Sequence, residues 1–314
     1  EINEQIARTA KMNMIIHDDG HTNVISADGL LPADELRTKS GNAGFAYNRF
    51  NFIITNPPFG SSVKQTEKAY LANYRMAAKE VDWLNPKSKA AARPNQSTEV
   101  LFIEQCHQFL VDGGYLAIVV PDGILTNSSL QYVRDNIEED YRIVAVVSMP
   151  QTAFMATGAG VKSSVLFLKK LTKKQSDKVK NAKTALKDQI KEEHKFSREY
   201  ARLEKERDTR IKGLDGFTNP DKLTGKALKE SEAYLEWKKA VTDECTEKLD
   251  TLKERMLETY DNKRRKLLDD YDIFMAIAED IGYDATGRST GTNELDVIGP
   301  ELARFIAAIE AGEA

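Results

Sequence analysis

Four short runs of consecutive apolar residues most constrain what this chain can fold into. They are Phe50–Thr55 (FNFIIT), Tyr115–Val120 (YLAIVV), Ile143–Met149 (IVAVVSM) and Ser163–Leu168 (SSVLFL). Runs of this length without polar alternation are typical of strands that are buried on both faces. Helical patterns lie between them, at 98–110 and 130–139. Strands that alternate with helices predict an α/β fold with a mostly parallel sheet covered by helices on both faces.

Further elements follow from periodicity and turn residues. They are a helix over 2–16, a short strand over Thr22–Ala27, a strand over Ile273–Ala278, a turn-rich loop over Gly282–Gly291 and a helix over Pro300–Ala311. Residues 61–96 are polar and contain two prolines, which indicates a long loop with some helix. A loop of this length is typical of a lid or a binding loop.

The middle of the chain differs in character from the rest. Residues 171–270 carry 26 Lys/Arg and 22 Asp/Glu, whereas the other 214 residues carry 19 and 27. Two charged stretches there have apolar residues three or four positions apart, and the turn-rich segment 213–225 separates them. This pattern predicts an inserted helical hairpin, or coiled-coil arm. The candidates for its apolar seam are Trp237, Leu249, Leu252 and Met256.

The chain therefore divides into three parts: an α/β core over 1–170, the charged arm over 171–272, and a strand and helix over 273–314 that return to the core. Cys106 and Cys245 are too few for a disulfide framework and favour a reducing compartment such as the cytoplasm. The four histidines and two cysteines do not cluster in sequence, so no metal site is expected. No apolar run is long enough to span a bilayer, and no membrane partner is expected.

Polar and turn residues follow three of the expected strands, at 28–29, 56–60 and 121–123. In open α/β sheets, ligands bind beyond the carboxyl ends of the strands. We therefore expect the ligand site at this edge of the sheet.

The most specific of these segments is Asn56-Pro57-Pro58-Phe59. The exocyclic amine of adenine is a poor nucleophile, because its lone pair is delocalised into the ring. The Asn56 side-chain oxygen and the Pro57 carbonyl would accept its N–H groups and localise that lone pair, and the prolines would keep both acceptors fixed. Phe59 offers a face on which an extruded base can stack. The simplest alternative is a turn that only ends a strand.

The segment NFIITNPPFG resembles the signature of the amino-methyltransferases that modify adenine N6 in DNA. Its context is most similar to the modification subunit of type I restriction-modification enzymes. EINEQIARTAKMNMIIH followed by ISADGL, the helix and strand of LFIEQCHQFLVDGGYLAIVVPDGIL, and SMPQTAFMATGAGVKSSVLFLKK resemble further motifs of that family. The resemblance covers 1–170 well and 273–308 more loosely, and the arm has no specific motif.

This resemblance implies a Rossmann-like, S-adenosylmethionine-dependent methyltransferase sheet. Glu1 matches the acidic residue that binds the cofactor's ribose hydroxyls, and Asp28, followed by Gly29, matches the residue that contacts its adenine ring. Phe154 lies where the family has a second aromatic that sandwiches the flipped base against Phe59. The family's first strands and glycine-rich loop would precede Glu1, so we interpret the chain as a fragment that lacks them.

The resemblance also implies partners: DNA, a specificity subunit that recognises the target sequence, and the restriction subunit of the same system. Two alternatives remain open. The fragment could be a non-catalytic assembly domain, or the parent protein could methylate another substrate of enzymes with this motif, namely cytosine N4, ribosomal RNA or protein glutamine. A cytosine-C5 methyltransferase is excluded, because neither Cys106 nor Cys245 follows a proline as its nucleophile typically does.

Overall fold

The computed structural model describes residues 1–19, 22–64, 69–158, 160–219, 221–267 and 270–313. They form two compact units. The first, here called the sheet unit, comprises Glu1–Glu80, Ala90–Lys178 and Tyr271–Ala314; the second, the arm unit, comprises Val81–Lys89 and Val179–Asp270. Within these bounds the arm begins at Val179, eight residues later than the sequence placed it. It also takes in 81–89, which the sequence assigned to the core.

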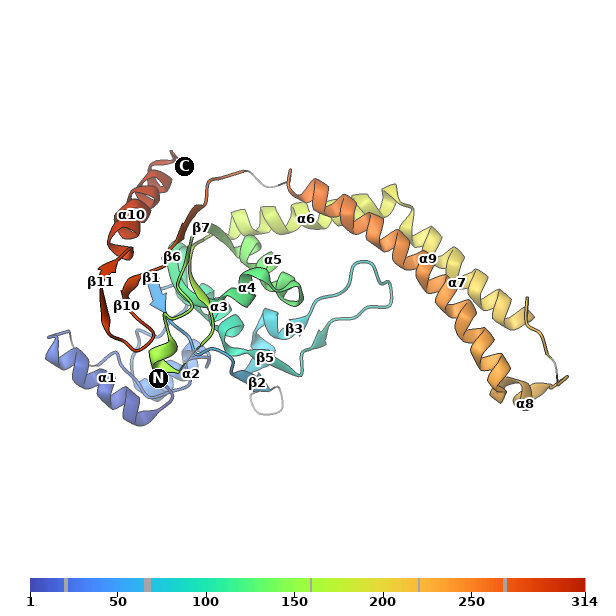
Figure 1. Ribbon diagram of the computed structural model, residues 1–314, viewed down its shortest axis with the longest axis horizontal. Helices are drawn as coiled ribbons and strands as arrows, with labels where there is room; N and C mark the ends of the chain where they lie inside the picture. Colours follow the sequence, from blue (N-terminus) through green and yellow to red (C-terminus); the bar gives the residue numbers. More distant parts are fainter. Residues whose placement is uncertain (20–21, 65–68, 159, 220, 268–269, 314) are drawn as a thin grey trace. The chain divides into compact units, whose positions relative to one another are not determined.

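The sheet unit is built on a five-stranded sheet, in the order β1 (Phe50–Thr55), β6 (Leu110–Pro121), β8 (Ser163–Lys170), β7 (Tyr141–Ser148) and β9 (Phe274–Ile277) (Figure 1). β1 is parallel to β6 and β7 is parallel to β9, while β8 is antiparallel to both of its neighbours. Four strands therefore run in one direction and only β8 opposes them, so their carboxyl ends meet at one edge. This is the α/β, Rossmann-like arrangement that the sequence predicted.

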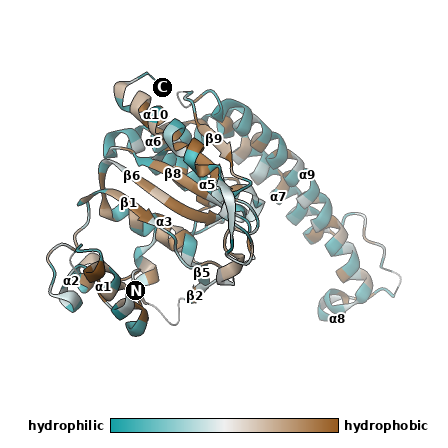
Figure 2. Cartoon of the chain, turned by 60° about the vertical axis from the view of Figure 1, so that its left-hand side comes forward, coloured by the Kyte–Doolittle hydropathy of each residue, from teal (hydrophilic) through white to brown (hydrophobic). Residues whose placement is uncertain are grey.

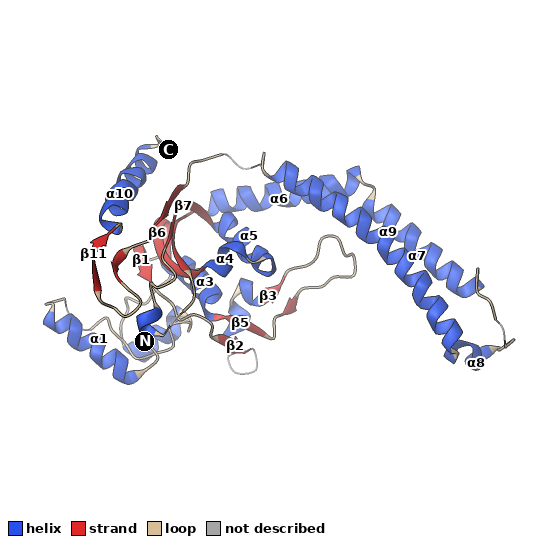
Figure 3. Cartoon of the chain, viewed as in Figure 1, coloured by secondary structure: helices blue, strands red, loops and turns tan. Residues whose placement is uncertain are grey.

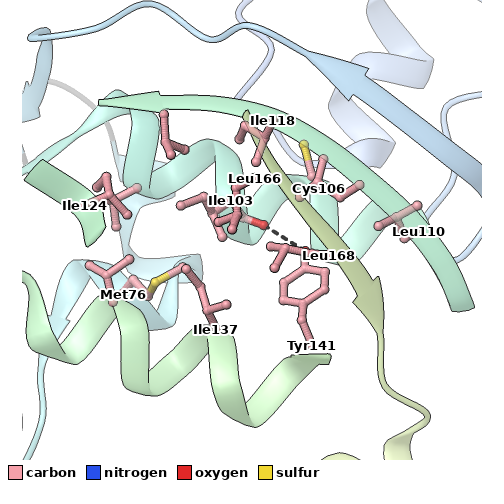
Figure 4. Close-up of a cluster of buried hydrophobic side chains, with 14 residues drawn as sticks. Met76, Ile103, Cys106, Leu110, Ile118, Ile124, Ile137, Tyr141, Leu166 and Leu168 are labelled. Carbon is pink, nitrogen blue, oxygen red and sulfur yellow. Dashed lines mark hydrogen bonds between the residues drawn. The ribbon is translucent and has the colours of Figure 1, made fainter. Parts of the chain in front are cut away.

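One face of the sheet packs on α3 (Thr98–Phe109), α4 (Asp122–Thr126) and α5 (Gln131–Asp140). Alternate residues of β6, from Leu116 to Val120, point into this layer, as the two-residue period of a strand requires. Figure 4 shows the cluster, in which Tyr141 donates a hydrogen bond to the carbonyl of Ile103. Because all of these side chains are buried, the layer is continuous from the helices to the strands.

The opposite face of the sheet packs on α10 (Leu295–Ala311), through Leu302, Ile309 and Phe305. The sequence placed the start of this helix at Pro300, since proline favours the first turn of a helix. In the structure Pro300 lies inside the helix, which begins five residues earlier. Among the described residues, no helix combines the length and apolar character needed to cross a bilayer.

Both edge strands leave apolar side chains exposed: Phe52 and Ile54 on β1, and Met275 and Ile277 on β9. The helices α1 (Glu4–Ile16) and α2 (Ala33–Ser40) belong to the same unit and precede β1. The strand that the sequence predicted at Thr22–Ala27 is wrong. That segment has no strand assignment: among the described residues its backbone hydrogen bonds to other segments are the two with Glu1, and a strand needs a longer ladder.

The long loop predicted over 61–96 contains more structure than expected. Two small antiparallel sheets close it, β2 (Ser62–Lys64) with β5 (Asn95–Ser97) and β3 (Ala78–Lys79) with β4 (Ala91–Ala92), and between them lie the 3₁₀ helices η1 (Ala69–Asn73) and η2 (Arg75–Ala77). The two ends of the insertion therefore pair with each other in β2 and β5, directly after the segment that follows β1.

Three shorter elements complete the sheet unit near the carboxyl edge. The 3₁₀ helices η3 (Ser128–Leu130) and η4 (Met155–Thr157) follow α4 and β7. The turn-rich loop predicted at Gly282–Gly291 is a hairpin of β10 (Ile281–Tyr283) and β11 (Ser289–Asn293). Asp284 stabilises its turn, because its carboxylate accepts hydrogen bonds from the backbone N–H groups of Thr286 and Arg288. Strands of three and five residues carry little periodicity, so turn residues dominate the sequence pattern.

The arm unit is a helical hairpin, with α6 (Lys173–Glu193) and α7 (Phe196–Gly213) on one limb and α9 (Glu232–Arg264) on the other; α8 (Gly225–Glu230) lies between them. A break at Lys195, which has left-handed backbone, separates α6 from α7. Met256 and Phe196 are fully buried in the seam, and Leu203 packs with Cys245 and Leu249. Figure 2 shows that the outer surface of these helices is largely hydrophilic, in contrast to the strands of the sheet.

Candidate functional site

The Asn56-Pro57-Pro58-Phe59 segment follows β1 directly, at the carboxyl edge of the sheet. Asn56 is exposed and Pro57 is buried; among the described residues, the Asn56 side chain has no hydrogen-bond partner. The N-terminus of α3 holds the segment, since the Thr98 hydroxyl donates to the Pro58 carbonyl at 2.9 Å. Gly60 then turns the chain with a φ of 73°, a conformation that favours glycine. The structure thus presents an exposed amide on a rigid backbone.

Phe59 and Phe154 lie together, although they are 95 residues apart in sequence. Their ring centroids are 6.1 Å apart, and the rings meet edge to face at 88°. Phe154 comes from the turn after β7, and the buried residues Val147, Met149 and Ala153 pack beneath it. Two rings that sandwich a base must be parallel with the base between them, so this pair would have to separate and rotate. Its role in base stacking stays a prediction.

Asp28 and Gly29 lie in a turn that buried side chains hold from two sides. The Asp28 carboxylate accepts hydrogen bonds from the Leu30 N–H at 3.0 Å and from the Tyr70 hydroxyl at 2.8 Å. On the other side, the Gln105 side-chain amide donates to the carbonyls of Gly29 and Leu31. A methyl group on Gly29 would lie 3.4 Å from the Phe102 ring, which is close but tolerable contact. The turn is therefore fixed in position by α3 and by the insertion after β1.

Glu1 lies beside this turn. Its carbonyl accepts a hydrogen bond from the Ala27 N–H at 2.9 Å, one residue before Asp28, and its carboxylate accepts one from the Asn3 N–H at 2.8 Å. Its side chain is exposed. The structure thus brings Glu1, Asp28 and Gly29 together, as their expected common role requires, and leaves that role itself a prediction.

A groove of about 550 Å³ runs along the free edge of β1, and we call it the edge groove. Glu1, Gly29, Thr55 and Gln105 contribute polar groups to its lining, and aromatic side chains supply much of the rest, namely Phe45, Phe50, Phe52, Phe102 and Phe109. This size and mixture are typical of sites for small molecules and cofactors. The Gln105 side chain is 3% exposed, and its carbonyl oxygen has no hydrogen-bond partner among the described residues.

These donors and acceptors fit S-adenosylmethionine. Its ribose hydroxyls and adenine amine are donors, and the carboxylate of Glu1 and the orphaned carbonyl of Gln105, both in the lining of the groove, are acceptors. Asp28 lies in the adjoining turn, outside that lining. The aromatic walls suit its flat adenine ring. We conclude that the residues present are chemically compatible with this cofactor.

Thiol and metal chemistry find no support in the structure. Cys106 lies in the core under the sheet, and burial raises the pKa of its thiol to about 12, which leaves it protonated. Cys245 is buried in the arm seam, and burial raises the pKa of that thiol as well. Within the part of the chain that the structure describes, no three His, Cys, Asp or Glu side chains lie close enough to hold a metal ion.

Sequence reasoning missed three residues that shape this site: Tyr70, Thr98 and Gln105. Thr98 and Gln105 are seven residues apart on α3, so they lie on one face of the helix and hold the segments at 58 and 29–31. No sequence signal singles out Gln105, because Glu104, His107 and Gln108 stand beside it on the same helix. Nothing in the sequence distinguishes Tyr70 from the other tyrosines.

Comparison with known proteins identifies a family. A family model described as N-6 DNA Methylase matches residues 1–247. The methylase subunit of the type I restriction enzyme EcoKI of Escherichia coli is 25% identical over 176 residues, which cover 55% of this chain and 28% of that protein. The methylase subunit of the StySJI enzyme of Salmonella typhimurium is 25% identical over 167 residues, covering 52% and 26%. The matched segment thus spans little more than a quarter of either relative.

Solved structures with detectable similarity include two type I proteins. The EcoKI M protein has a TM-score of 0.38 and 22% identity, over 56% of this chain and 31% of that one. A type I methyltransferase subunit from Streptococcus thermophilus has a TM-score of 0.39 and 20% identity, over 58% and 40%. The family model and the curated relatives confirm the resemblance to type I modification subunits that the motifs indicated.

Proposed function

The chain belongs to the N-6 DNA methylase family, and from this premise we propose that it carries the catalytic site of a modification subunit of a type I-like restriction-modification system. In this proposal the subunit transfers a methyl group from S-adenosylmethionine to adenine N6 in DNA. The matched relatives are methylase subunits of type I enzymes, which supports a role in DNA methylation.

The observation that carries the proposal is the position and support of Asn56-Pro57-Pro58-Phe59. The segment leaves β1 at the edge where the carboxyl ends of four strands meet, and Thr98 fixes its backbone. A plain turn would need no such combination of an exposed amide, two prolines and an aromatic ring. The same helix reaches the Asp28–Leu31 turn through Gln105, so a single rigid element supports both halves of the site.

Each residue has a defined part in the proposed reaction. The Asn56 side-chain oxygen and the Pro57 carbonyl accept the two N–H groups of the adenine amine, which localises the lone pair on nitrogen. Preorganised acceptors at a reacting centre lower the barrier because they need no reorganisation during the reaction. Phe59 stacks on the extruded base, and Phe154 covers its other face once the two rings separate.

S-adenosylmethionine would lie in the edge groove, held by Glu1, Gly29 and Gln105 from its lining and by Asp28 from the turn beside it, and it supplies an electrophilic methyl group when bound. The aromatic lining excludes water from the adenine ring of the cofactor. The carboxylates of Glu1 and Asp28 orient it by accepting from its ribose and its amine.

The proposed partners follow from the relatives. They are DNA, a specificity subunit that selects the target sequence, and the restriction subunit of the same system, all in the cytoplasm. The net charge of the chain is −4. Strong binding to DNA by the chain alone would require a positive surface, so delegation of recognition to a specificity subunit fits this charge.

The experiment that tests the proposal is methyl transfer by the full polypeptide with its partner subunits. Labelled S-adenosylmethionine is incubated with unmethylated DNA, and the labelled nucleoside is identified by chromatography. We expect N6-methyladenine, and we expect Asn56→Ala to reduce the rate by about 10²–10³ or more, with cofactor affinity nearly unchanged.

The matched control is Asn51→Ala, which removes an exposed asparagine from the same strand and should leave the rate unchanged. Label in N4-methylcytosine, in RNA or in protein would replace adenine with another substrate of enzymes that carry this motif. Transfer by Asn56→Ala at the parent's rate would show that Asn56 is not catalytic.

A further inference from the structure

The loop that follows β7 carries Phe154, and we call its residues 150–158 the Phe154 loop. Its first turn is closed by the Ala153 N–H, which donates to the Pro150 carbonyl at 3.0 Å. The Ala153 side chain is buried and belongs to the apolar cluster that packs beneath Phe154. The backbone just before Phe154 is therefore held both by a turn of the loop and by the core below it.

The hairpin of β10 and β11 lies against the Phe154 loop at two points. The Tyr283 hydroxyl donates to the Ala153 carbonyl at 3.2 Å, across 130 residues of sequence. At the turn of the hairpin, a methyl group on Gly287 would lie 3.8 Å from Cβ of Ala156, which is ordinary van der Waals contact. The hairpin thus meets the loop on both sides of Phe154.

The hairpin is itself a firm support. Just before α10, the Glu294 carboxylate accepts hydrogen bonds from the N–H groups of Glu279 and Asp280 at 2.6 and 3.2 Å. The Asp280 carboxylate in turn accepts from the hydroxyls of Thr290 and Thr292 on the opposite strand. Because these bonds join the two strands to each other and to the start of α10, the hairpin cannot shift without breaking several of them.

The bond from Tyr283 fixes the peptide unit that ends at Phe154. A peptide unit is planar, so once one Cα is held, the position of the carbonyl oxygen sets the orientation of the whole unit up to the next Cα. The Ala153 carbonyl belongs to the unit that joins Ala153 to Phe154. The following unit is also held, since the Met155 N–H donates to the Thr152 carbonyl at 3.1 Å. With both units held, the Phe154 ring moves by rotation about its side-chain bonds.

From these contacts we infer that Tyr283 is a positioning residue for the target base: its hydroxyl holds the backbone from which Phe154 closes on the extruded adenine. The inference rests on the proposed function, because it takes Phe154 as one wall of the base pocket. Phe154 must leave its edge-to-face contact with Phe59 to stack on a base, and a fixed backbone limits this change to a rotation of the side chain. Tyr283 touches no reacting atom and acts through the Phe154 loop.

A fixed loop strengthens stacking for an entropic reason. If the backbone at Phe154 had to become ordered when the base arrived, the free-energy cost of ordering it would be subtracted from the stacking energy. The hairpin avoids that cost by holding the loop before the base binds. It lies beyond residues 1–247, the part of the chain that the family model matches, so the inference assigns a role to a segment outside that match.

The test compares the affinity of the full polypeptide, with its partner subunits, for two DNA duplexes. Both contain the sequence in which the methyl-transfer experiment locates the modified adenine, and in one of them an abasic site replaces that adenine. The ratio of their dissociation constants, adenine over abasic, measures what the base itself contributes. We expect Tyr283→Phe, which keeps the ring and removes only the hydroxyl, to raise this ratio about threefold, within the range for one net hydrogen bond.

Phe154→Ala calibrates the measurement. It should raise the ratio about tenfold or more, the effect of losing one aromatic stacking partner. A lower folded fraction weakens binding of both duplexes equally, so partial unfolding of a variant cannot imitate a change in the ratio. The affinity for S-adenosylmethionine, measured by calorimetry, should be unchanged in both variants.

The matched control is Tyr115→Phe. Its hydroxyl also ties the C-terminal part of the chain to the sheet, because it donates to Glu310 on α10. Its loss should leave the ratio unchanged. In the Phe154→Ala background, Tyr283→Phe should have little further effect if it acts through Phe154.

Three results would each overturn the inference: an unchanged ratio in Tyr283→Phe, an equal rise in Tyr115→Phe, or a full threefold rise when Tyr283→Phe is added to Phe154→Ala. Failure of the proposed function has a different signature. If Phe154→Ala itself leaves the ratio unchanged, Phe154 does not stack on the base, and the proposed base pocket fails together with this inference.

Discussion

The sheet unit and the arm unit bury their apolar side chains in different ways. In the sheet unit, helices cover both faces of the strands, and central residues such as Ile118 and Leu168 are completely buried. In the arm unit, two small clusters of apolar side chains join the helical limbs. Figure 3 shows the corresponding contrast in secondary structure, since the arm between Val179 and Arg264 contains helices and no strands among its described residues.

The surface of the arm unit is notable for its ion pairs. Ion pairs between exposed side chains are frequent along the arm helices, and examples are Arg202 with Glu199 and Glu206, Arg210 with Glu244, and Lys263 with Glu193. Exposed pairs of this kind contribute little stability individually. The sheet unit thus buries its strands between layers of helices, whereas the arm unit combines an apolar seam with a largely polar surface.

The largest effect is expected from removing the arm unit, which tests whether the sheet unit folds without it. We predict that replacing 179–270 and 81–89 with short Gly/Ser linkers leaves a folded sheet unit and abolishes co-purification with the partner subunit. Both segments must be replaced, because Trp83 and Leu84 pack against Met256 and Tyr260 and would otherwise be exposed. Residues 173–178 are retained, since Ser176 bonds to Asp140 in the sheet unit. Circular dichroism and co-purification are the measurements.

A matched control replaces only 214–223, between α7 and α8, and should retain the partner. If the variant without the arm still assembles and modifies DNA, docking by the arm is wrong. If it fails to fold, the two units are not independent, and the comparison between them fails.

The second prediction compares the loss of stability caused by a cavity in each of the two units. We expect Ile118→Ala in the sheet to cost about 4 kcal/mol, and Met256→Ala in the arm about 2 kcal/mol, because two helices can close partly around a cavity while a sheet covered on both faces cannot. Leu257→Ala, at the neighbouring position with 43% of its side chain exposed, should cost no more than about 0.5 kcal/mol. Denaturant unfolding, followed for each unit, measures all three, and equal costs at 118 and 256 would contradict the argument.

The smallest expected effect is the pH dependence of the arm's melting temperature. Hydrogen bonds from Lys248 and Arg210 lower the pKa of Glu244 from 4.5 to about 2. Because the pKa is lower in the folded state, the stabilisation is complete above pH 4.5 and is lost as the pH falls toward 2. The melting temperature of the arm should therefore fall between about pH 6 and about pH 3, and less so in Glu244→Gln.

Glu230→Gln is the control for this effect, since it removes an exposed carboxylate whose partner Lys226 is 3.5 Å away. That variant should melt like wild type at both pH values. An acid shift of the same size in Glu244→Gln as in wild type would show that the Glu244 pairs do not stabilise the hairpin.

The sequence by itself predicted the strands of the sheet, the helical arm and the candidate site at Asn56–Phe59. Short, mostly apolar runs such as FNFIIT and SSVLFL predict strands from local composition. Their burial does not follow from it: SSVLFL is a central strand, whereas FNFIIT is an edge strand that leaves Phe52 and Ile54 exposed. The apolar residues of the arm recur every three or four positions within charged stretches, and this pattern is also visible from local sequence alone. Asn56-Pro57-Pro58-Phe59 could be singled out because the proposed chemistry uses these four residue types in direct succession.

Only the tertiary structure decided how distant segments meet. Thr22–Ala27 has the composition of a strand but lacks a long enough partner to form one, and 81–89 joins the arm because Trp83 and Leu84 find apolar partners there. The bond from Tyr70 to Asp28 and the edge-to-face contact of Phe59 with Phe154 join residues that share no local pattern. Local sequence indicates whether a residue favours burial and which backbone conformation it favours. Which distant residue it contacts depends on the path of the whole chain.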